Sequence, residues 1–555
     1  MRVPASAWSY NVALNESLVS QSQQEQIVLA EGTFSFLKET VEHGYRVCLT
    51  FSPNGKQLIR NCHLAIPVST SPEDWLLCNG FQSWTETYWR RPGDQIPQLR
   101  KIARPLMGYY GDYHIDWIPR KKGCLHSWSW TERRQAGQPM ELIASLNENT
   151  AFTCFQWRSQ EGQLSVEIDC RNWEVDEPVT LADFVVLEGT VDQVYDEWTN
   201  LMQLPPLRAK IARGWTSWYQ HYTNVSENIV AENLSAFKRK GKPLDFFQID
   251  DGYQKAVGDW LSIDASFPAG MKNLANSIRA SGPEPGLWLA PCIADRRSKL
   301  LAQHPEWVQK DHRGRPLKAG YNPLWKGWFY ALNTEHEGWQ EHLQQVFTTV
   351  VEKWGYGMLK LDFLYAACIF PQAQWTRAQL MRRTLENIRR WSGDAYLLGC
   401  GTPLASGFGI FDYCRIGADI HLRWEHRMLR WFRHRERVST LVALRSVLGR
   451  WPLAGRVWRN DPDVYLLRDE NMHLSEQERR LVHRLNTTLG ELLFTSDNPD
   501  TYGRFQSTEE EWQRTHWQTK DWQVHPAEGG IFALSNAEKN YQVELGKTTG
   551  RWSEK

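Results

Sequence analysis

The segment GMLKLDFLY (357–365) decides how this chain folds. Its apolar residues predict a short buried strand over Met358–Leu361, and two polar residues, Lys360 and Asp362, stand near the carboxyl end of that strand. Apolar residues at helical spacing precede and follow it: Leu343, Val346, Phe347, Val350 and Trp354 on one side, and Met381, Leu385, Ile388 and Trp391 on the other. A buried strand between two amphipathic helices is the repeating unit of a parallel α/β fold.

The same alternation continues in both directions along the chain. The predicted strands are Ile211–Trp215, Phe246–Ile249, Leu287–Ala290, Met358–Leu361, Ala395–Leu398, Tyr413–Ile416 and Glu491–Thr495. Such a long series favours a (β/α)8 TIM barrel. A doubly wound sheet is the alternative, but no GxGxxG motif follows any of these strands.

The two ends of the chain have a different pattern. Short strands separated by turns fill the N-terminal part and predict an antiparallel β-sandwich, with YRVCLTF (45–51), QLIRNCHLAIPV (57–68), QLSVEIDC (163–170) and TLADFVVLEG (180–189) as examples. Near the C-terminus, IFALSN (531–536) and YQVELGK (541–547) predict a small antiparallel β-domain. We therefore expect a multidomain protein: a β-sandwich over 1–200, the barrel over 208–512 and a C-terminal β-domain over 513–555.

The charge balance of the chain limits the classes of molecule that we expect it to bind. The 64 basic residues equal the 64 acidic ones, so no broad positive field is available for nucleic acid or anionic lipid. No apolar run approaches the roughly 20 residues that span a bilayer. We expect a small, weakly charged molecule as substrate, with no nucleic acid and no membrane as partner.

The cysteine and tryptophan content bears on the cellular compartment of the protein and on the kind of ligand it binds. The ten cysteines stand singly, without a CxxC pair or zinc-type spacing, so we expect buried free thiols, no metal and no cofactor. The N-terminus lacks the apolar core of a secretory signal, which predicts a cytoplasmic protein. The 29 tryptophans are expected to lie mostly in cores, although indole rings also stack on sugars.

Charged residues gather where the predicted barrel strands end. Asp250 and Asp251 follow the second strand, and Arg415 and Asp419 lie in and after the sixth. Lys360 lies in the fourth strand, and Asp362 directly follows it. The carboxyl ends of barrel strands face one cavity, so these groups should converge. Helix caps or plain ion pairs would explain any one of them, but a buried cluster of this kind is costly unless it serves a ligand.

Paired carboxylates are the requirement of glycoside cleavage. One attacks the anomeric carbon, and the other protonates the leaving oxygen and then activates water. Lys360 lies two residues from Asp362 on the same side of its strand, and we expect it to keep that carboxylate ionised as a nucleophile. A general acid needs a raised pKa, which Arg415 would oppose at Asp419 unless it turned toward the substrate.

An ordered set of motifs resembles glycoside hydrolase family 36, which consists mainly of α-galactosidases. The motifs are GWTSWY (214–219), FFQIDDGYQ (246–254), GLWLAP (286–291), LKLDFLY (359–365) and LLGCGTPLASGFGIFDYCRIGADI (397–420). They run in order through the predicted barrel, and the two flanking β-domains are also similar to that family. Thr216 and Tyr253 stand where many members have cysteine and tryptophan.

The resemblance assigns roles to individual residues. It implies a retaining α-galactosidase, acting on terminal galactosides of the raffinose or melibiose type, with Asp362 as nucleophile and Asp419 as acid/base. The residues that resemble the family's sugar ligands are Asp250, Asp251, Lys360, Arg415, Trp288, Trp84, Trp218 and Tyr219.

Other functions remain open at this stage. An α-N-acetylgalactosaminidase or a galactosyl transglycosylase would use the same fold and the same two carboxylates. A non-catalytic carbohydrate-binding protein is the alternative of another class, although it would not need both. The sequence leaves the oligomeric state unknown.

Overall fold

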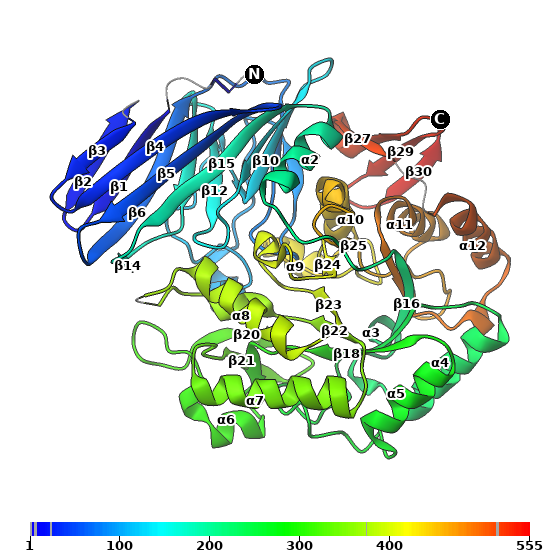
Figure 1. Cartoon of the computed structure of the whole chain (residues 1–555). Coiled ribbons are helices and arrows are strands. Elements are labelled where there is room, and N and C mark those ends of the chain that lie inside the picture. The colour runs from blue at the N-terminus through cyan, green and yellow to red at the C-terminus, as the bar shows by residue number, and fades with distance from the viewer. Residues whose placement is uncertain (1–2, 5–7, 23–24, 373, 518–520) are drawn as a thin grey trace.

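The computed structural model describes residues 3–4, 8–22, 25–372, 374–517 and 521–555. In Figure 1 the N-terminal sheets, coloured blue to cyan, lie to one side of the central α/β region, and the small red C-terminal sheet lies beside them.

The central region is a nearly closed barrel of eight parallel strands. Its order is β25-β24-β23-β22-β18-β17-β16-β26. The strands are β16 Ala212–Thr216, β17 Phe246–Ile249, β18 Glu284–Leu289, β22 Met358–Leu361, β23 Tyr396–Gly399, β24 Tyr413–Arg415, β25 Arg459–Asp461 and β26 Leu492–Thr495. Between β25 and β26 the ring is joined by a single bridge, Val464 to Phe494, and by the Glu491 N–H, which donates to Asn460 O at 2.9 Å. The predicted TIM barrel is confirmed.

Seven of the eight strands coincide with predicted ones, with ends displaced by up to three residues. The eighth, β25, was missed because its sequence Arg-Asn-Asp contains no apolar residue. Its last two residues, Asn460 and Asp461, are nevertheless fully buried. A strand of three polar residues gives no periodic signal, and only its place between β24 and β26 makes it a barrel strand.

Helices surround the barrel as the apolar spacing predicted. The faces predicted around β22 belong to α7 (Glu337–Thr348), which continues into a π-helical turn over Thr349–Lys353, and to α8 (Arg377–Trp391). The other long helices are α4 Glu227–Arg239, α5 Gly270–Ala280, α10 Thr440–Arg450, α11 Glu476–Leu489 and α12 Arg504–His516. After β18 the chain adds a small sheet of β19 Ile293–Asp295, β20 Lys318–Asn322 and β21 Gly327–Ala331.

The N-terminal region is the predicted antiparallel sandwich. One sheet contains β1 Ser9–Leu14, β2 Ser17–Ser22, β6 Gln57–Pro67, β9 Cys124–Trp128, β12 Thr153–Arg158, β13 Gln163–Ile168 and β14 Trp173–Val175. The other contains β3 Gln26–Leu29, β4 Gly32–Val41, β5 Gly44–Pro53, β7 Trp75–Cys78, β8 Tyr88–Arg90, β10 Trp130–Arg134, β11 Met140–Ser145 and β15 Val179–Gly189. Apolar side chains from both sheets, such as Leu64 and Phe184, form one buried core.

Sheet pairing supports the proposed division into three domains. In the described part of the chain, each sheet draws its strands from only one of the three segments. The C-terminal sheet consists of β27 Gln523–Ala527, β28 Ile531–Ser535, β29 Asn540–Leu545 and β30 Gly550–Glu554, all antiparallel. The helix α2 (Val191–Leu201) leads from the sandwich toward the barrel.

Aromatic packing joins the sandwich to the barrel. Trp198 of α2 lies 5.7 Å from Trp130 of the sandwich and 5.8 Å from Phe408 of the barrel, measured between ring centroids. Most tryptophans are buried, as predicted. All ten cysteines are free thiols, nine of them buried, which also agrees with the prediction. No helix among the described residues is long and apolar enough to cross a membrane.

A loop of the sandwich, residues 79–87 between β7 and β8, is fixed to the barrel by one buried arginine. Arg450, at the end of α10, is fully buried, and burial lowers the pKa of its guanidinium. Its side chain donates to Asn79 Oδ1 at 2.9 Å and to the carbonyl oxygens of Gly80, Gln82, Ser83 and Thr85 at 2.6–3.4 Å. It also donates to Ile416 O of the barrel at 3.0 Å. The guanidinium therefore supplies the hydrogen-bond donors that water would otherwise give to the buried carbonyl oxygens of this loop.

We expect Arg450→Met to destabilise the protein strongly. The substitution leaves several buried carbonyl oxygens without donors, and each such loss costs about 1–3 kcal/mol. The apparent melting temperature, measured by scanning fluorimetry, should fall by roughly 5 °C or more. Arg390→Met, which removes an exposed arginine of α8, is the matched control and should change it little. Equal melting temperatures for the two variants would contradict this role of Arg450.

Candidate active site

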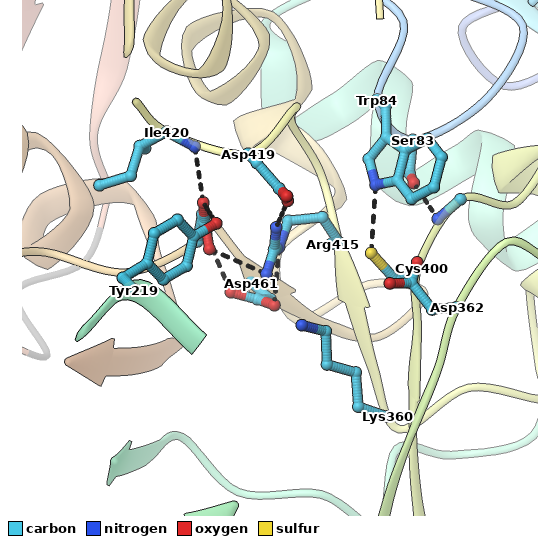
Figure 2. A network of polar contacts seen from close by, with 12 residues as sticks. Ser83, Trp84, Tyr219, Lys360, Asp362, Cys400, Arg415, Asp419, Ile420 and Asp461 are labelled. Carbon is cyan, nitrogen blue, oxygen red and sulfur yellow. Dashed lines mark hydrogen bonds and ion pairs between the residues drawn. The ribbon is translucent and has the colours of Figure 1, made fainter. Parts of the chain in front are cut away.

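The charged residues predicted from the strand ends do converge at one end of the barrel. In Figure 2, Asp362 lies beside Cys400 and Trp84, while Asp419 lies with Arg415 and Asp461. These side chains come from β22, β23 and β24, from β25, and from the sandwich loop 79–87. The site therefore needs both the closed barrel and the N-terminal region.

Asp362 follows β22 and is 8% exposed. Its Oδ2 accepts a hydrogen bond from Trp288 Nε1 at 3.0 Å, and its Oδ1 accepts one from the Phe363 N–H at 3.0 Å. Phe363 has φ 54°, a left-handed conformation that is costly for a bulky residue and turns the chain sharply after Asp362. Burial raises the pKa of Asp362, the nearby Asp419 charge adds to this, and Lys360 and Trp288 oppose it.

Lys360 does not form its ion pair with Asp362, which corrects the sequence-based expectation. Its Nζ pairs with Asp250 Oδ2 at 2.8 Å, although β18 lies between the strand of Lys360, β22, and the strand that precedes Asp250, β17. Burial alone would lower the pKa of Lys360, but the charge of Asp250 outweighs it and raises that pKa. Lys360 therefore neutralises Asp250, and the net pKa of Asp362 is raised rather than lowered. Sequence spacing indicated which side of β22 both residues face but not which carboxylate the lysine reaches.

Arg415 forms the centre of a carboxylate cluster. Its Nη1, Nε and Nη2 pair with Asp419 at 2.8 Å, Asp461 at 3.0 Å and Asp463 at 2.8 Å. Guanidinium has five N–H donors, so three carboxylates leave little of it for a ligand. The sequence-based argument required Arg415 to turn toward the substrate and away from Asp419. Instead, Arg415 Nη1 donates to Asp419 Oδ1 at 2.8 Å.

Two members of this cluster, Asp461 and Asp463, were not identified from the sequence. Both are fully buried, and burial raises the pKa of Asp463 to about 7 although Arg415 opposes the shift. Tyr219 donates its hydroxyl to Asp463, and the Ile420 N–H donates to the same carboxylate at 2.8 Å. The only signal was the pair of aspartates in Asn-Asp-Pro-Asp (460–463), at the end of β25, a strand that the sequence did not reveal.

The tandem aspartates have different surroundings. Asp250 is paired with Lys360 and also accepts from Gln248 Nε2 at 2.9 Å. In the described part of the chain, the side chain of Asp251 accepts from neutral donors alone, Trp325 Nε1 at 2.7 Å and Gln254 Nε2 at 2.6 Å. Burial raises the pKa of Asp251 to about 6. Asp251 and Trp325 also line an open polar hollow of about 490 Å³ beside the barrel end.

Trp84 reaches the site from the sandwich loop, as its sequence motif predicted. Its Nε1 donates to Cys400 Sγ at 3.2 Å, and its ring packs edge-on against Phe363 at 5.0 Å. The preceding Ser83 accepts from the Gly401 N–H at 2.8 Å, which ties the loop to the end of β23. Trp84 and Trp288 thus place two indole rings next to Asp362 (Figure 2 shows the former).

Trp218 differs from the other predicted residues. It is half-buried and packs edge-on against Tyr222 at 5.2 Å. Among the described residues it forms no side-chain hydrogen bond to this cluster. Its predicted contact with a sugar therefore stays a prediction. The hydroxyl of its neighbour Tyr219 already donates a hydrogen bond to Asp463.

Comparisons with known proteins agree with the geometry. The family model described as Melibiase matches residues 213–367. The solved α-galactosidase TtGalA of Thermus thermophilus, in complex with p-nitrophenyl α-D-galactopyranoside, is 26% identical with a TM-score of 0.72, covering 93% of this chain and 98% of that one. The family 36 α-galactosidase AgaA of Geobacillus stearothermophilus has a TM-score of 0.64 at 13% identity over 98% of this chain and 81% of its own, and it supports the fold alone.

Matches to curated sequences are shorter. An A type blood α-D-galactosamine galactosaminidase of Flavonifractor plautii is 26% identical over 209 residues, 34% of this chain. This and two further curated relatives are covered by the alignments over only 19%, 23% and 14% of their own lengths.

The raised pKa of Asp251 makes a prediction about stability. Its ordinary value is 3.8, so between about pH 4 and 6 the folded protein keeps a proton that the unfolded chain releases. Stability is therefore lost as pH rises through this window, by about 3 kcal/mol at most. Asp251→Asn does not titrate, so its melting temperature relative to the wild type should rise between pH 4 and 7. A difference that does not change with pH would contradict the raised pKa.

Proposed function

We propose that this chain, a relative of the glycoside hydrolase family 36 α-galactosidases, is itself a retaining α-galactosidase that hydrolyses terminal α-D-galactosides of small oligosaccharides. The observation that carries the proposal is the meeting of Asp362 and Asp419 at one end of the barrel, close enough for the charge of one to raise the pKa of the other. Double displacement needs two carboxylates at one site, one as nucleophile and one as acid/base.

Asp362 acts as the nucleophile in the first step. Its carboxylate attacks the anomeric carbon, the bond to the leaving oxygen breaks, and a covalent glycosyl-enzyme ester forms. Trp288 and the Phe363 N–H hold the two carboxylate oxygens, so the group is oriented before the substrate arrives. The burial that raises its pKa also removes the water that would otherwise solvate it.

Asp419 supplies and then recovers the proton. In the first step it protonates the leaving oxygen. In the second step it takes a proton from a water molecule, and that water attacks the anomeric carbon and releases galactose from Asp362. Its side chain is 32% exposed, which suits a group that must meet both a leaving group and water. Arg415 holds it in place from a cluster in which two further carboxylates share the positive charge.

Sugar recognition is assigned to the opposite side of the site. The Asp250–Lys360 pair and Asp251 present charged acceptors and a donor to hydroxyl groups, and Trp84 and Trp288 offer apolar faces. Buried polar groups of this kind discriminate strongly, because a sugar without the matching hydroxyl leaves them unpaired. Trp218, Tyr219 and Arg415 are proposed to contribute to the same pocket, the last two through Asp463 and Asp419.

Two further proposals concern the setting of the reaction. We propose a cytoplasmic location, supported by ten free cysteines. We propose an oligosaccharide as the substrate, with no nucleic acid and no membrane as partner. N-acetylgalactosamine stays the alternative sugar, and the similarity to an α-D-galactosamine galactosaminidase supports testing a sugar with nitrogen at carbon 2. Hydrolysis of the nitrophenyl α-glycoside of N-acetylgalactosamine, compared with that of the α-galactoside, decides between the two sugars.

The stereochemical outcome tests the mechanism directly. Double displacement retains configuration, so hydrolysis of p-nitrophenyl α-galactoside should release α-galactose first, with the β-anomer appearing only through mutarotation. Proton NMR during the first minutes follows both anomeric signals. Initial release of β-galactose would mean inversion and would make Asp362 a base. Absence of hydrolysis for both nitrophenyl glycosides would overturn the proposed activity.

The two carboxylates should fail in different ways when removed. Asp362→Gly should lose several orders of magnitude in kcat on every substrate, and azide should partly restore turnover by forming β-galactosyl azide. Asp419→Ala should lose much more on melibiose, whose leaving group is poor, than on p-nitrophenyl α-galactoside. Equal losses on both substrates for Asp419→Ala, or substantial activity of Asp362→Gly without azide, would exclude the assigned roles.

A further inference from the structure

A second feature of the barrel end lies outside the catalytic cluster. The loop of residues 420–438 leaves the barrel directly after Asp419 and returns to it, since the Ser439 N–H donates to Asp419 O at 2.9 Å. The sequence of this loop, IHLRWEHRMLRWFRHRERV, contains six arginines and only two glutamates. In a chain whose charges balance overall, this is a concentrated positive segment.

Two of the six arginines are neutralised within the fold. Arg435 is buried and paired with Asp112, and Arg437 holds Glu425 through two hydrogen bonds of 3.0 and 2.9 Å. The other four are exposed and have no carboxylate partner in the described part of the chain: Arg423, Arg427, Arg430 and Arg433. Their charge is therefore available to a ligand.

These four arginines line a hollow of about 700 Å³ together with Arg100, Lys547 and the ring of Trp431. Glu425 is the only carboxylate in its lining, and Arg437 already pairs with it. Trp431, in the short helix α9 (Arg427–Trp431), remains 53% exposed although Arg100 lies 4.3 Å from its ring centre. A smaller hollow of about 290 Å³ adjoins it and shares Arg430 and Arg433.

Three distant parts of the chain fix the shape of this hollow. The Arg100 N–H, from the sandwich region, donates to Phe432 O at 3.0 Å. From the barrel loop, Trp424 Nε1 donates to Gly546 O at 2.9 Å and Arg430 Nη1 donates to Lys547 O at 3.2 Å, both in the turn between β29 and β30. The basic groups are thus presented by a framework of three domains and not by a free tail.

We propose that this hollow binds an anionic saccharide, a sugar chain that carries carboxylate or sulfate groups. Guanidinium groups bind such anions through paired hydrogen bonds, and an exposed indole ring stacks on a pyranose face. The volume suits a small ligand, and the balanced charge of the chain gives no net attraction for nucleic acid or an anionic bilayer. Arg430 and Arg433, shared between the two hollows, suit an elongated ligand.

The position of the loop connects this site to the catalytic one. Arg423 is four residues from Asp419, so their Cα atoms lie within about 14 Å of each other. An acidic sugar held here lies near the residue proposed to protonate the leaving group. The choice of a saccharide rests on the proposed function, whereas the anion-binding groups do not depend on it.

Direct binding tests the proposal without any turnover. Trigalacturonate and a sulfated galactose trisaccharide are titrated calorimetrically into the full-length protein, with the methyl ester of trigalacturonate as the neutral match. At least one acidic sugar should bind, the methyl ester should bind at least about tenfold more weakly, and added salt should weaken binding because exposed charges are screened. Parallel titrations with inorganic sulfate, a single-stranded oligonucleotide and vesicles containing phosphatidylserine show whether the protein also binds other kinds of anion.

Variants assign the binding to this hollow. Arg423→Ser/Arg427→Ser/Arg433→Ser should weaken acidic sugar binding by about tenfold or more, and Trp431→Ala should weaken the sugar but not sulfate. The control Lys272→Ser/Lys353→Ser/Arg390→Ser removes three exposed charges elsewhere and should change the affinity less than about twofold. Melting temperatures report whether each variant is folded.

Several outcomes would overturn the proposal. They are no binding of either acidic sugar, equal binding of the methyl ester, unchanged binding by the folded triple arginine variant, or tighter binding of the oligonucleotide or the vesicles. Because hydrolysis of p-nitrophenyl α-galactoside is measured separately, failure of anion binding and failure of the proposed activity are distinct results.

Discussion

Closure of the barrel through β25 is the constraint on which the rest of the site depends. This strand of three polar residues fills the place between β24 and β26, and hydrogen bonds from Glu491 and Arg459 tie it to its surroundings. Without it, Asp461 and Asp463 would not reach Arg415, and Arg415 would have only Asp419 as a partner. The short strand thus determines the electrostatics around the proposed acid/base.

Burial of so many carboxylates at the site lowers the stability of the folded state. The pKa values of Asp251 and Asp463 are raised to about 6 and about 7, so ionisation of either group at neutral pH lowers the stability of the folded state. Two cations, Lys360 and Arg415, compensate part of this cost, each shared with specific carboxylates. Clusters of buried carboxylates with raised pKa values are typical of functional sites, where a ligand rich in hydroxyl groups can bind to them.

The site also depends on parts of the chain outside the barrel. The sandwich contributes Trp84 through the loop that Arg450 fixes, and it contributes Arg100 to the basic hollow. The C-terminal β-domain holds the loop 420–438 through its turn at Gly546 and Lys547. Both flanking domains therefore shape the space around Asp419, and variation in their loops is a route to different leaving groups on one catalytic core.

The sequence by itself determined the fold class, seven of the eight barrel strands and the strand ends that carry the chemistry. Apolar periodicity and the alternation of strands with helices are local properties, and the rule that parallel strand ends share a cavity places Asp250, Asp362 and Asp419 together without coordinates. Only the tertiary structure decided which charges pair. Lys360 pairs with Asp250 and not Asp362, because partner choice depends on distances between strands that sequence spacing does not contain. The same holds for β25, for Arg450 and for the basic hollow, since each is defined by contacts between residues far apart in the chain.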